Sequence, residues 1–140
     1  MTTTNNLTTR TRKIFYWLST GFAAFALTAA GATSLMRGPQ IVATMSHLGY
    51  PSYVAAILGM WKLLGVLAIL VPGFVRLKEW AYAGFFFDLT GAAMSHAAAG
   101  DPARVVIVPL VLLATVIASW ALLPARRALV APRLNPAQAV

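Results

Sequence analysis

The sequence predicts an all-α membrane protein, an antiparallel bundle of four transmembrane helices with a short interfacial helix between the first and the second. Hydrophobic residues make up 59% of the 140 residues and charged residues only 10%, against about a quarter charged in an average soluble domain. Four apolar runs approach the ~20 residues that a helix needs to cross hydrocarbon. The basic residues flank these runs, as topology signals do.

The same composition excludes several classes of function. The chain has no cysteine, which rules out disulfides, thiolate metal sites and iron–sulfur clusters within it. Its 11 basic residues against 3 acidic ones do not form the clustered patch of a nucleic-acid-binding protein. No nucleophile–base pair, phosphate loop or metal-spaced ligand set is apparent. We therefore expect no catalytic residue, no metal and no nucleic-acid partner.

The first part of the chain divides at two helix-breaking points. Residues 1–13 are Thr/Asn-rich and are predicted to form a disordered cytoplasmic tail. The first transmembrane helix is expected over residues 14–36. A signal peptide is the alternative interpretation, but the apolar run is longer than the ~7 to 15 residues of a signal-peptide core. Gly38-Pro39 ends it, and residues 39–48 have the amphipathic spacing of an interfacial helix.

Three more helices are expected over residues 52–71, 80–98 and 103–123. Pro72-Gly73 ends the second helix, and the residues from Arg76 to Glu79 are interpreted as a basic loop. Asp101 is predicted to be the N-cap of the last helix, in which Pro109 should produce a kink. Residues 124–140 are expected to form a second cytoplasmic tail.

The distribution of basic residues predicts the orientation in the membrane. The two tails and the loop between the second and third helices hold eight of them, and the other two loops hold only Arg37 and Arg104. Both termini should therefore be cytoplasmic.

Lys62 and Asp88 lie inside apolar runs, where translocon scales give a cost of roughly 2.5 to 3.5 kcal/mol for either charge at a helix centre. Lys62 lies ten residues before Pro72, and Asp88 lies nine residues after Glu79. Both should lie roughly 14 Å from the same membrane boundary at ~1.5 Å per residue. Neighbouring antiparallel helices can join them as an intramembrane ion pair. Such a pair either forms part of a site or only fixes the helix register.

The residues around this pair suggest a polar pocket. Small residues at helical spacing either allow close helix packing or leave room for a ligand. His96, two helical turns from Asp88, is either a candidate proton relay or an interface residue with no functional role. Flat apolar side chains such as Trp61 suit a quinone or another isoprenoid lipid, although they are also ordinary packing residues. The candidate ligand or relay residues are Lys62, Asp88, His96, Ser95, Trp61 and Gly91.

A polar vestibule is predicted on the outer side of the membrane, over the pair. Its candidate residues are His47, Asp101, Arg104 and Arg37. Haem ligation by two histidines is not favoured, because His47 is expected in the interfacial helix.

Several motifs together resemble the DoxX-like family of small bacterial membrane proteins. They are Leu48-Gly49-Tyr50-Pro51, the runs 58–65 and 77–92, Ser95-His96 and Gly100-Asp101. The resemblance implies a four-helix bundle that crosses the bacterial cytoplasmic (inner) membrane several times. The family name derives from a subunit associated with a thiosulfate:quinone oxidoreductase, and other relatives are redox-complex components or assembly factors. Many relatives carry a carboxylate on the second helix, where this chain has Lys62, and a lysine near the end of the first, which ends here at Ser34-Leu35-Met36.

Three functions follow as hypotheses. The first is a non-catalytic membrane protein that binds a lipid-like ligand or a membrane partner through the pocket around Lys62 and Asp88. The second is a subunit of a quinone-linked oxidoreductase, which the lack of an intrinsic redox group makes inactive alone. The third is a small proton-coupled transporter, for which a homo-oligomer would be expected at this length.

Overall fold

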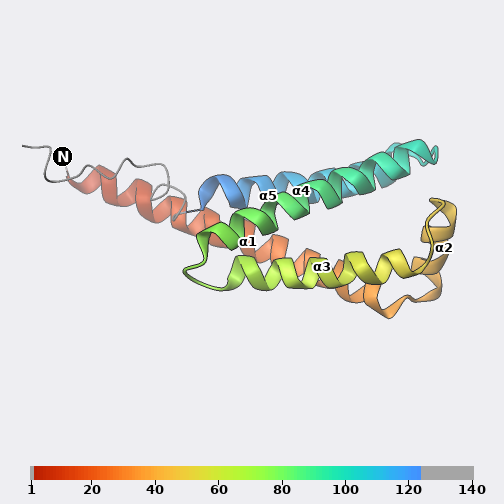
Figure 1. Cartoon of the computed structure of the whole chain (residues 1–140). Coiled ribbons are helices and arrows are strands. Elements are labelled where there is room, and N and C mark those ends of the chain that lie inside the picture. The colour runs from red at the N-terminus through yellow and green to blue at the C-terminus, as the bar shows by residue number, and fades with distance from the viewer. Residues whose placement is uncertain (1, 124–140) are drawn as a thin grey trace, which may run out of the picture.

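The computed structural model describes the backbone of residues 2–123 and the side chains of residues 10–123, and this part of the chain is all-α (Figure 1). The expected C-terminal tail lies outside the described residues. The five helices are α1 (Thr2–Met36), α2 (Pro39–His47), α3 (Tyr53–Leu70), α4 (Val75–Ala98) and α5 (Ala103–Leu122).

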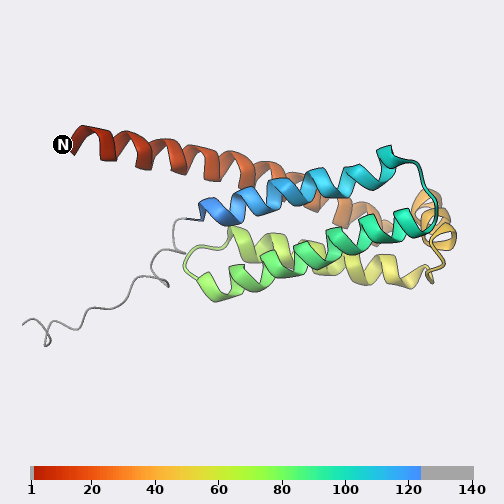
Figure 2. The ribbon, with the colours of Figure 1, turned by 90° about the horizontal axis from the view of Figure 1, so that it is seen from above.

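Four of these helices are long and lie side by side, while the short α2 stands at one end (Figures 1 and 2). Helix α1 packs against α3 and α5, and α4 packs against the same two helices. Figure 1 shows that α3 and α4 are close together at their connecting turn and diverge toward α2. We call these two ends of the molecule the turn end and the α2 end.

Three of the described helices are long and apolar enough to cross a membrane: Arg10–Met36 of α1, α3 and α5. Large apolar side chains on their outer faces, among them Phe25 and Trp61, are exposed. A soluble protein would leave such surfaces in water at a high cost, whereas lipid solvates them. The apolar helices therefore indicate a membrane protein.

Two helix boundaries differ from the sequence-based prediction. Helix α1 begins at Thr2, so residues 2–13 are helical and do not form the expected disordered tail. They contain neither Gly nor Pro, so nothing interrupts the backbone hydrogen bonds of the helix that follows. Helix α4 begins at Val75, which places Arg76, Lys78 and Glu79 in its first turns and not in a loop.

The early start of α4 has a structural consequence at the turn end. Lys78 is buried, and its ammonium donates to the carbonyl of Ile69 in the last turn of α3. A cation is favoured there because the last carbonyls of a helix are unsatisfied and carry partial negative charge. The next residue of α4, Glu79, accepts a hydrogen bond from Trp120 Nε1 at 2.6 Å, which links α5 to α4.

Three hydroxyl groups form a cluster where α1, α4 and α5 meet near the turn end. Ser119 Oγ lies 2.6 Å from Thr20 Oγ1 and 2.7 Å from the Tyr82 hydroxyl. All three residues are buried, so their hydroxyls form hydrogen bonds with one another in place of bonds to water. We call Thr20, Tyr82 and Ser119 the hydroxyl cluster.

Helices α1 and α3 approach each other closely at a pair of glycines. A Cβ added to Gly59 would lie 2.6 Å from the carbonyl oxygen of Gly31, and one added to Gly31 would lie 3.0 Å from that of Gly59. Neither position has room for a side chain. Small residues between membrane helices allow the two backbones to approach this closely.

Candidate functional site

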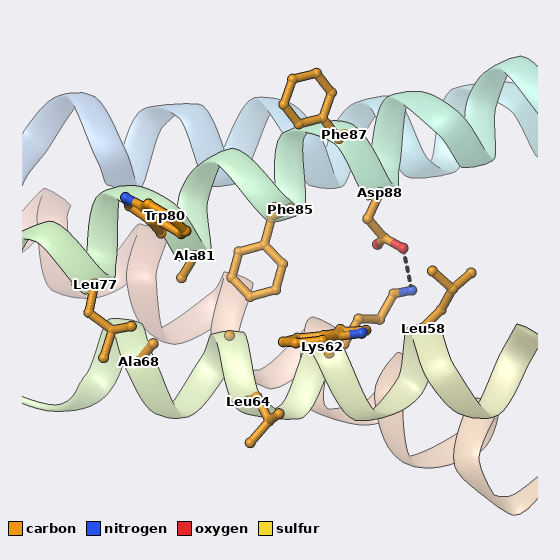
Figure 3. A pocket seen from close by; sticks show the side chains of 13 residues that line it. Leu58, Lys62, Leu64, Ala68, Leu77, Trp80, Ala81, Phe85, Phe87 and Asp88 are labelled. Atoms are coloured by element: carbon orange, nitrogen blue, oxygen red, sulfur yellow. Dashed lines mark hydrogen bonds and ion pairs between the residues drawn. The ribbon is translucent and has the colours of Figure 1, made fainter.

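Lys62 and Asp88 meet between α3 and α4. Nζ of Lys62 donates to Oδ1 of Asp88 at 2.8 Å, and the side chains are 13% and 15% exposed. Figure 3 shows the lysine reaching from α3 and the carboxylate pointing back from α4. This is the contact that the depth of the two residues predicts. A pair so largely removed from solvent is costly to form unless its remaining hydrogen-bonding groups are also satisfied.

One of these remaining groups is not satisfied within the part of the chain that the structure describes. Oδ2 of Asp88 is closed off from solvent and has no hydrogen-bond partner among the described residues. A carboxylate oxygen without a partner costs about 1–3 kcal/mol or more. An unpaired buried acceptor in a native protein calls for an explanation such as a bound molecule.

A lateral cavity of about 560 Å³ opens beside the pair, between α3 and α4. Apart from Lys62 and Asp88 its wall is apolar, with Leu58, Phe85 and Trp80 among the lining residues (Figure 3). Several rim side chains are exposed to the surroundings of the helices, including Trp61 at 67% and Phe87 at 71%. In a membrane the cavity would face the lipid chains.

A second cavity of about 540 Å³ lies on the other side of the pair, toward the α2 end. Lys62 and Asp88 line both cavities, so the pair stands at the junction between them. The wall of the second cavity is more polar and includes Ser95, His96 and Gly91 on α4 and Thr44 on α2. We call it the α2-end cavity.

The glycines near the pair serve two different purposes. On α3, Gly59 packs against the α1 backbone, and a Cβ on Gly65 would lie 2.6 Å from the ring of Phe85. On α4, a Cβ added to Gly84 or Gly91 would meet nothing within 4 Å. Gly84 lines the lateral cavity and Gly91 lines the α2-end cavity, so the α4 glycines leave room where the α3 glycines allow contact.

His96, which lines the α2-end cavity, shares one carboxylate with His47. Nε2 of His47 donates to Oδ1 of Asp101 at 2.8 Å, and Nδ1 of His96 donates to Oδ2 at 2.6 Å. The bond from His96, and after it the bond from His47, lowers the pKa of the Asp101 carboxyl. Asp101 is therefore not the N-cap of α5 that the sequence suggested: Pro102 is at that position without a side-chain cap bond, because both carboxylate oxygens bind histidine.

Ser95 joins α4 to the segment before α3. Its hydroxyl donates to the carbonyl of Gly91 at 2.8 Å, which leaves its oxygen to accept from the Tyr50 hydroxyl at 2.9 Å. The remaining two vestibule candidates, Arg37 and Arg104, are exposed and line neither cavity. The structure thus brings together eight of the ten candidate residues and leaves these two arginines outside. Five of the eight line the α2-end cavity, Trp61 lines the lateral cavity, and His47 and Asp101 are joined to His96 by hydrogen bonds.

Comparison with known proteins identifies the family of the chain. The model of the DoxX-like family matches residues 18–119, which is most of the chain and contains α2, α3, α4 and the site. The chain belongs to the DoxX-like family. No curated protein and no solved structure matched it.

The sequence-based reasoning missed two features of this DoxX-like chain. One is the wall that α2 contributes to the α2-end cavity through Thr44, Met45 and Leu48, since an interfacial helix was expected to lie on lipid. The other is the hydroxyl cluster. The sequence contained an indication of this cluster. Thr20, Tyr82 and Ser119 are polar residues within apolar runs, and the predicted topology places all three toward the same side of the membrane.

Proposed function

We propose that this DoxX-like protein is a non-catalytic integral membrane protein that binds a lipid-like ligand beside Lys62 and Asp88. The observation that carries the proposal is the position of the pair at the junction of two cavities, with Oδ2 of Asp88 lacking a partner among the described residues. A pair that only fixed the helix register would be expected to have both partners satisfied and packed against side chains. Here the α4 glycines keep both sides of the pair open.

The proposed membrane arrangement has four antiparallel spans, α1, α3, α4 and α5, with α2 at the outer interface of a bacterial inner membrane. Helix α4 is not among the three helices that are apolar enough to cross a membrane by composition, and its polar residues include Asp88, Ser95 and His96. The partners of these three residues are supplied by α3 and the loops. Both termini are placed in the cytoplasm by the basic residues.

Single-cysteine labelling of intact cells tests this orientation, since the natural chain has no cysteine. His47→Cys and Asp101→Cys should react with an impermeant reagent, and Arg76→Cys should react only after the cells are opened. The reverse pattern would place the α2 end in the cytoplasm and overturn the orientation.

Native mass spectrometry of the gently extracted full chain tests the binding function. We expect the wild-type protein to retain a lipid-like adduct and Gly84→Leu to lose it, because the leucine projects into the lateral cavity without a steric clash at Cβ. Gly21→Leu is the matched control, since Gly21 also has free space and lines none of the cavities described. Absence of an adduct from the wild-type protein, or equal retention by Gly84→Leu, would contradict the proposal.

The aromatic lining of the lateral cavity favours a second candidate, a subunit of a quinone-linked oxidoreductase. Trp61, Trp80 and Phe85 offer flat faces on which a quinone ring could stack. Copurification of a quinone with a partner chain that carries a redox group would support this function over simple lipid binding.

A further inference from the structure

We propose that the ligand of the lateral cavity has a neutral hydroxyl head group, an alcohol or a phenol, on a hydrocarbon tail. This inference rests on the proposed function, because it assigns the chemistry of the molecule bound there. It follows from the charges of the pair, from its unused hydrogen-bonding groups and from the lining of the cavity.

The charge of the pair excludes an ionic head group. Lys62 and Asp88 are in contact at 2.8 Å, so together they present no net charge to a molecule beside them. An anionic head group would be repelled by Asp88, and a cationic one by Lys62. In either case the complex would carry one uncompensated charge in a low-dielectric place, which is strongly unfavourable. A neutral head group leaves the pair balanced.

The unused hydrogen-bonding groups require both a donor and an acceptor. A lysine ammonium has three N–H donors, and one of those of Lys62 is used within the described residues, in the bond to Asp88. A carboxylate offers about four acceptor sites, and Oδ2 of Asp88 uses none of its own. A hydroxyl accepts from the ammonium through its oxygen and donates its proton to the carboxylate. An ether or a ketone can only accept and leaves the carboxylate oxygen unpaired.

The carboxylate can turn toward such a head group. Oδ2 is covered by protein in the structure, but the last torsion of an aspartate side chain is broad and roughly two-fold. A modest rotation therefore brings either oxygen to the cavity without moving the helix. Figure 3 shows Asp88 and Lys62 at one side of the lateral cavity and apolar side chains over the rest of it. The polar groups thus contact the head group, and Ala68, Leu77 and Phe85 contact the tail.

Two probes that differ in one hydrogen-bond donor test this inference. Para-dodecylphenol and its methyl ether share the ring, the tail and an acceptor oxygen on the ring, but a methyl group replaces the hydroxyl hydrogen in the ether, so only the phenol can donate. We would measure the binding of each to the full-length protein in nanodiscs by native mass spectrometry. The phenol should bind about tenfold more tightly, as expected for one hydrogen bond to a charged group. Equal binding of phenol and ether would overturn the inference and leave the proposed function standing. Binding of neither would overturn both.

Asp88→Asn tests whether the carboxylate is the acceptor. The amide oxygen can still accept from Lys62, and the amide nitrogen then presents a donor to the head group, which both probe oxygens can accept. The preference for the phenol should fall from about tenfold to about one. Gly84→Leu should lose both probes, and Gly21→Leu should keep the wild-type preference. An unchanged preference in Asp88→Asn would overturn the inference. If this variant does not fold, the comparison of the two probes on the wild-type protein still decides it.

Discussion

The hydroxyl cluster and the Lys62–Asp88 pair are two polar groups inside one apolar protein, and their surroundings are opposite. Thr20, Tyr82 and Ser119 are neutral, buried and bonded to one another. The pair is charged, stands between two cavities and has one oxygen without a hydrogen-bond partner in the described part of the chain. A closed, fully paired cluster holds helices together, whereas an open and incompletely paired one is suited to receive another molecule. The difference separates the structural part of the molecule from its candidate site.

The largest expected effect comes from breaking the pair on one side. Asp88→Asn leaves the Lys62 ammonium without a counter-charge in its largely buried position and should lower the stability by about 3–5 kcal/mol. The double change Lys62→Met with Asp88→Leu removes both charges and should cost much less. Thermal melting in detergent measures both. Equal loss in the two variants would mean that the charges are not coupled.

The next effect tests the closed cluster. Ser119→Ala removes the hydroxyl that Thr20 and Tyr82 share, and the loss of these two buried hydrogen bonds should lower the stability by about 1–3 kcal/mol. Ser19→Ala is the matched control, because the Ser19 hydroxyl donates only to carbonyls of its own helix, and it should change little. The Ser119→Ala variant should still retain the ligand at temperatures where it is folded. Loss of the ligand with a preserved fold would show that the cluster is not purely structural.

A smaller effect distinguishes the two kinds of glycine. Gly59→Ala would place Cβ 2.6 Å from the Gly31 carbonyl, and such overpacking should cost about 1–3 kcal/mol. Gly91→Ala meets no atom within 4 Å and should be neutral or slightly stabilising, because alanine is the better helix former. The same detergent melts compare them. A Gly91→Ala variant as unstable as Gly59→Ala would mean that the α2-end cavity is not open.

The smallest effect is the pH dependence of the histidine contacts. The pKa of Asp101 is lowered from 3.8, so the contacts stabilise the fold fully above that value and are lost as the pH falls through the folded-state pKa. An NMR titration of the Asp101 carboxyl should show the lowered pKa. His96→Gln should bring it back toward 3.8 more than His47→Gln does, because the bond from His96 is the larger cause. A greater effect of His47→Gln would reverse this order.

The sequence predicts the helical elements and the pair because both depend on quantities that are readable along one chain. Apolar run length and helix-breaking residues locate the helix ends to within one residue, except for the starts of α1 and α4, and equal depth places Lys62 opposite Asp88. The start of α4 was placed too late, because charged residues such as Lys78 look like a loop until the carbonyl of Ile69 is seen beside them. Whether a glycine packs or leaves space depends on the neighbouring helix, so Gly59 and Gly91 could not be told apart from sequence.

The side-chain hydrogen bonds between helices are distributed unevenly along the molecule. At the turn end, Lys78, Glu79 and the hydroxyl cluster fasten all four long helices to one another. At the α2 end, where α3 and α4 diverge (Figure 1), the contacts of His47 and Tyr50 span the gap. Because the turn end is fastened, loss of these two hydrogen bonds is expected to let α3 and α4 separate most at the α2 end.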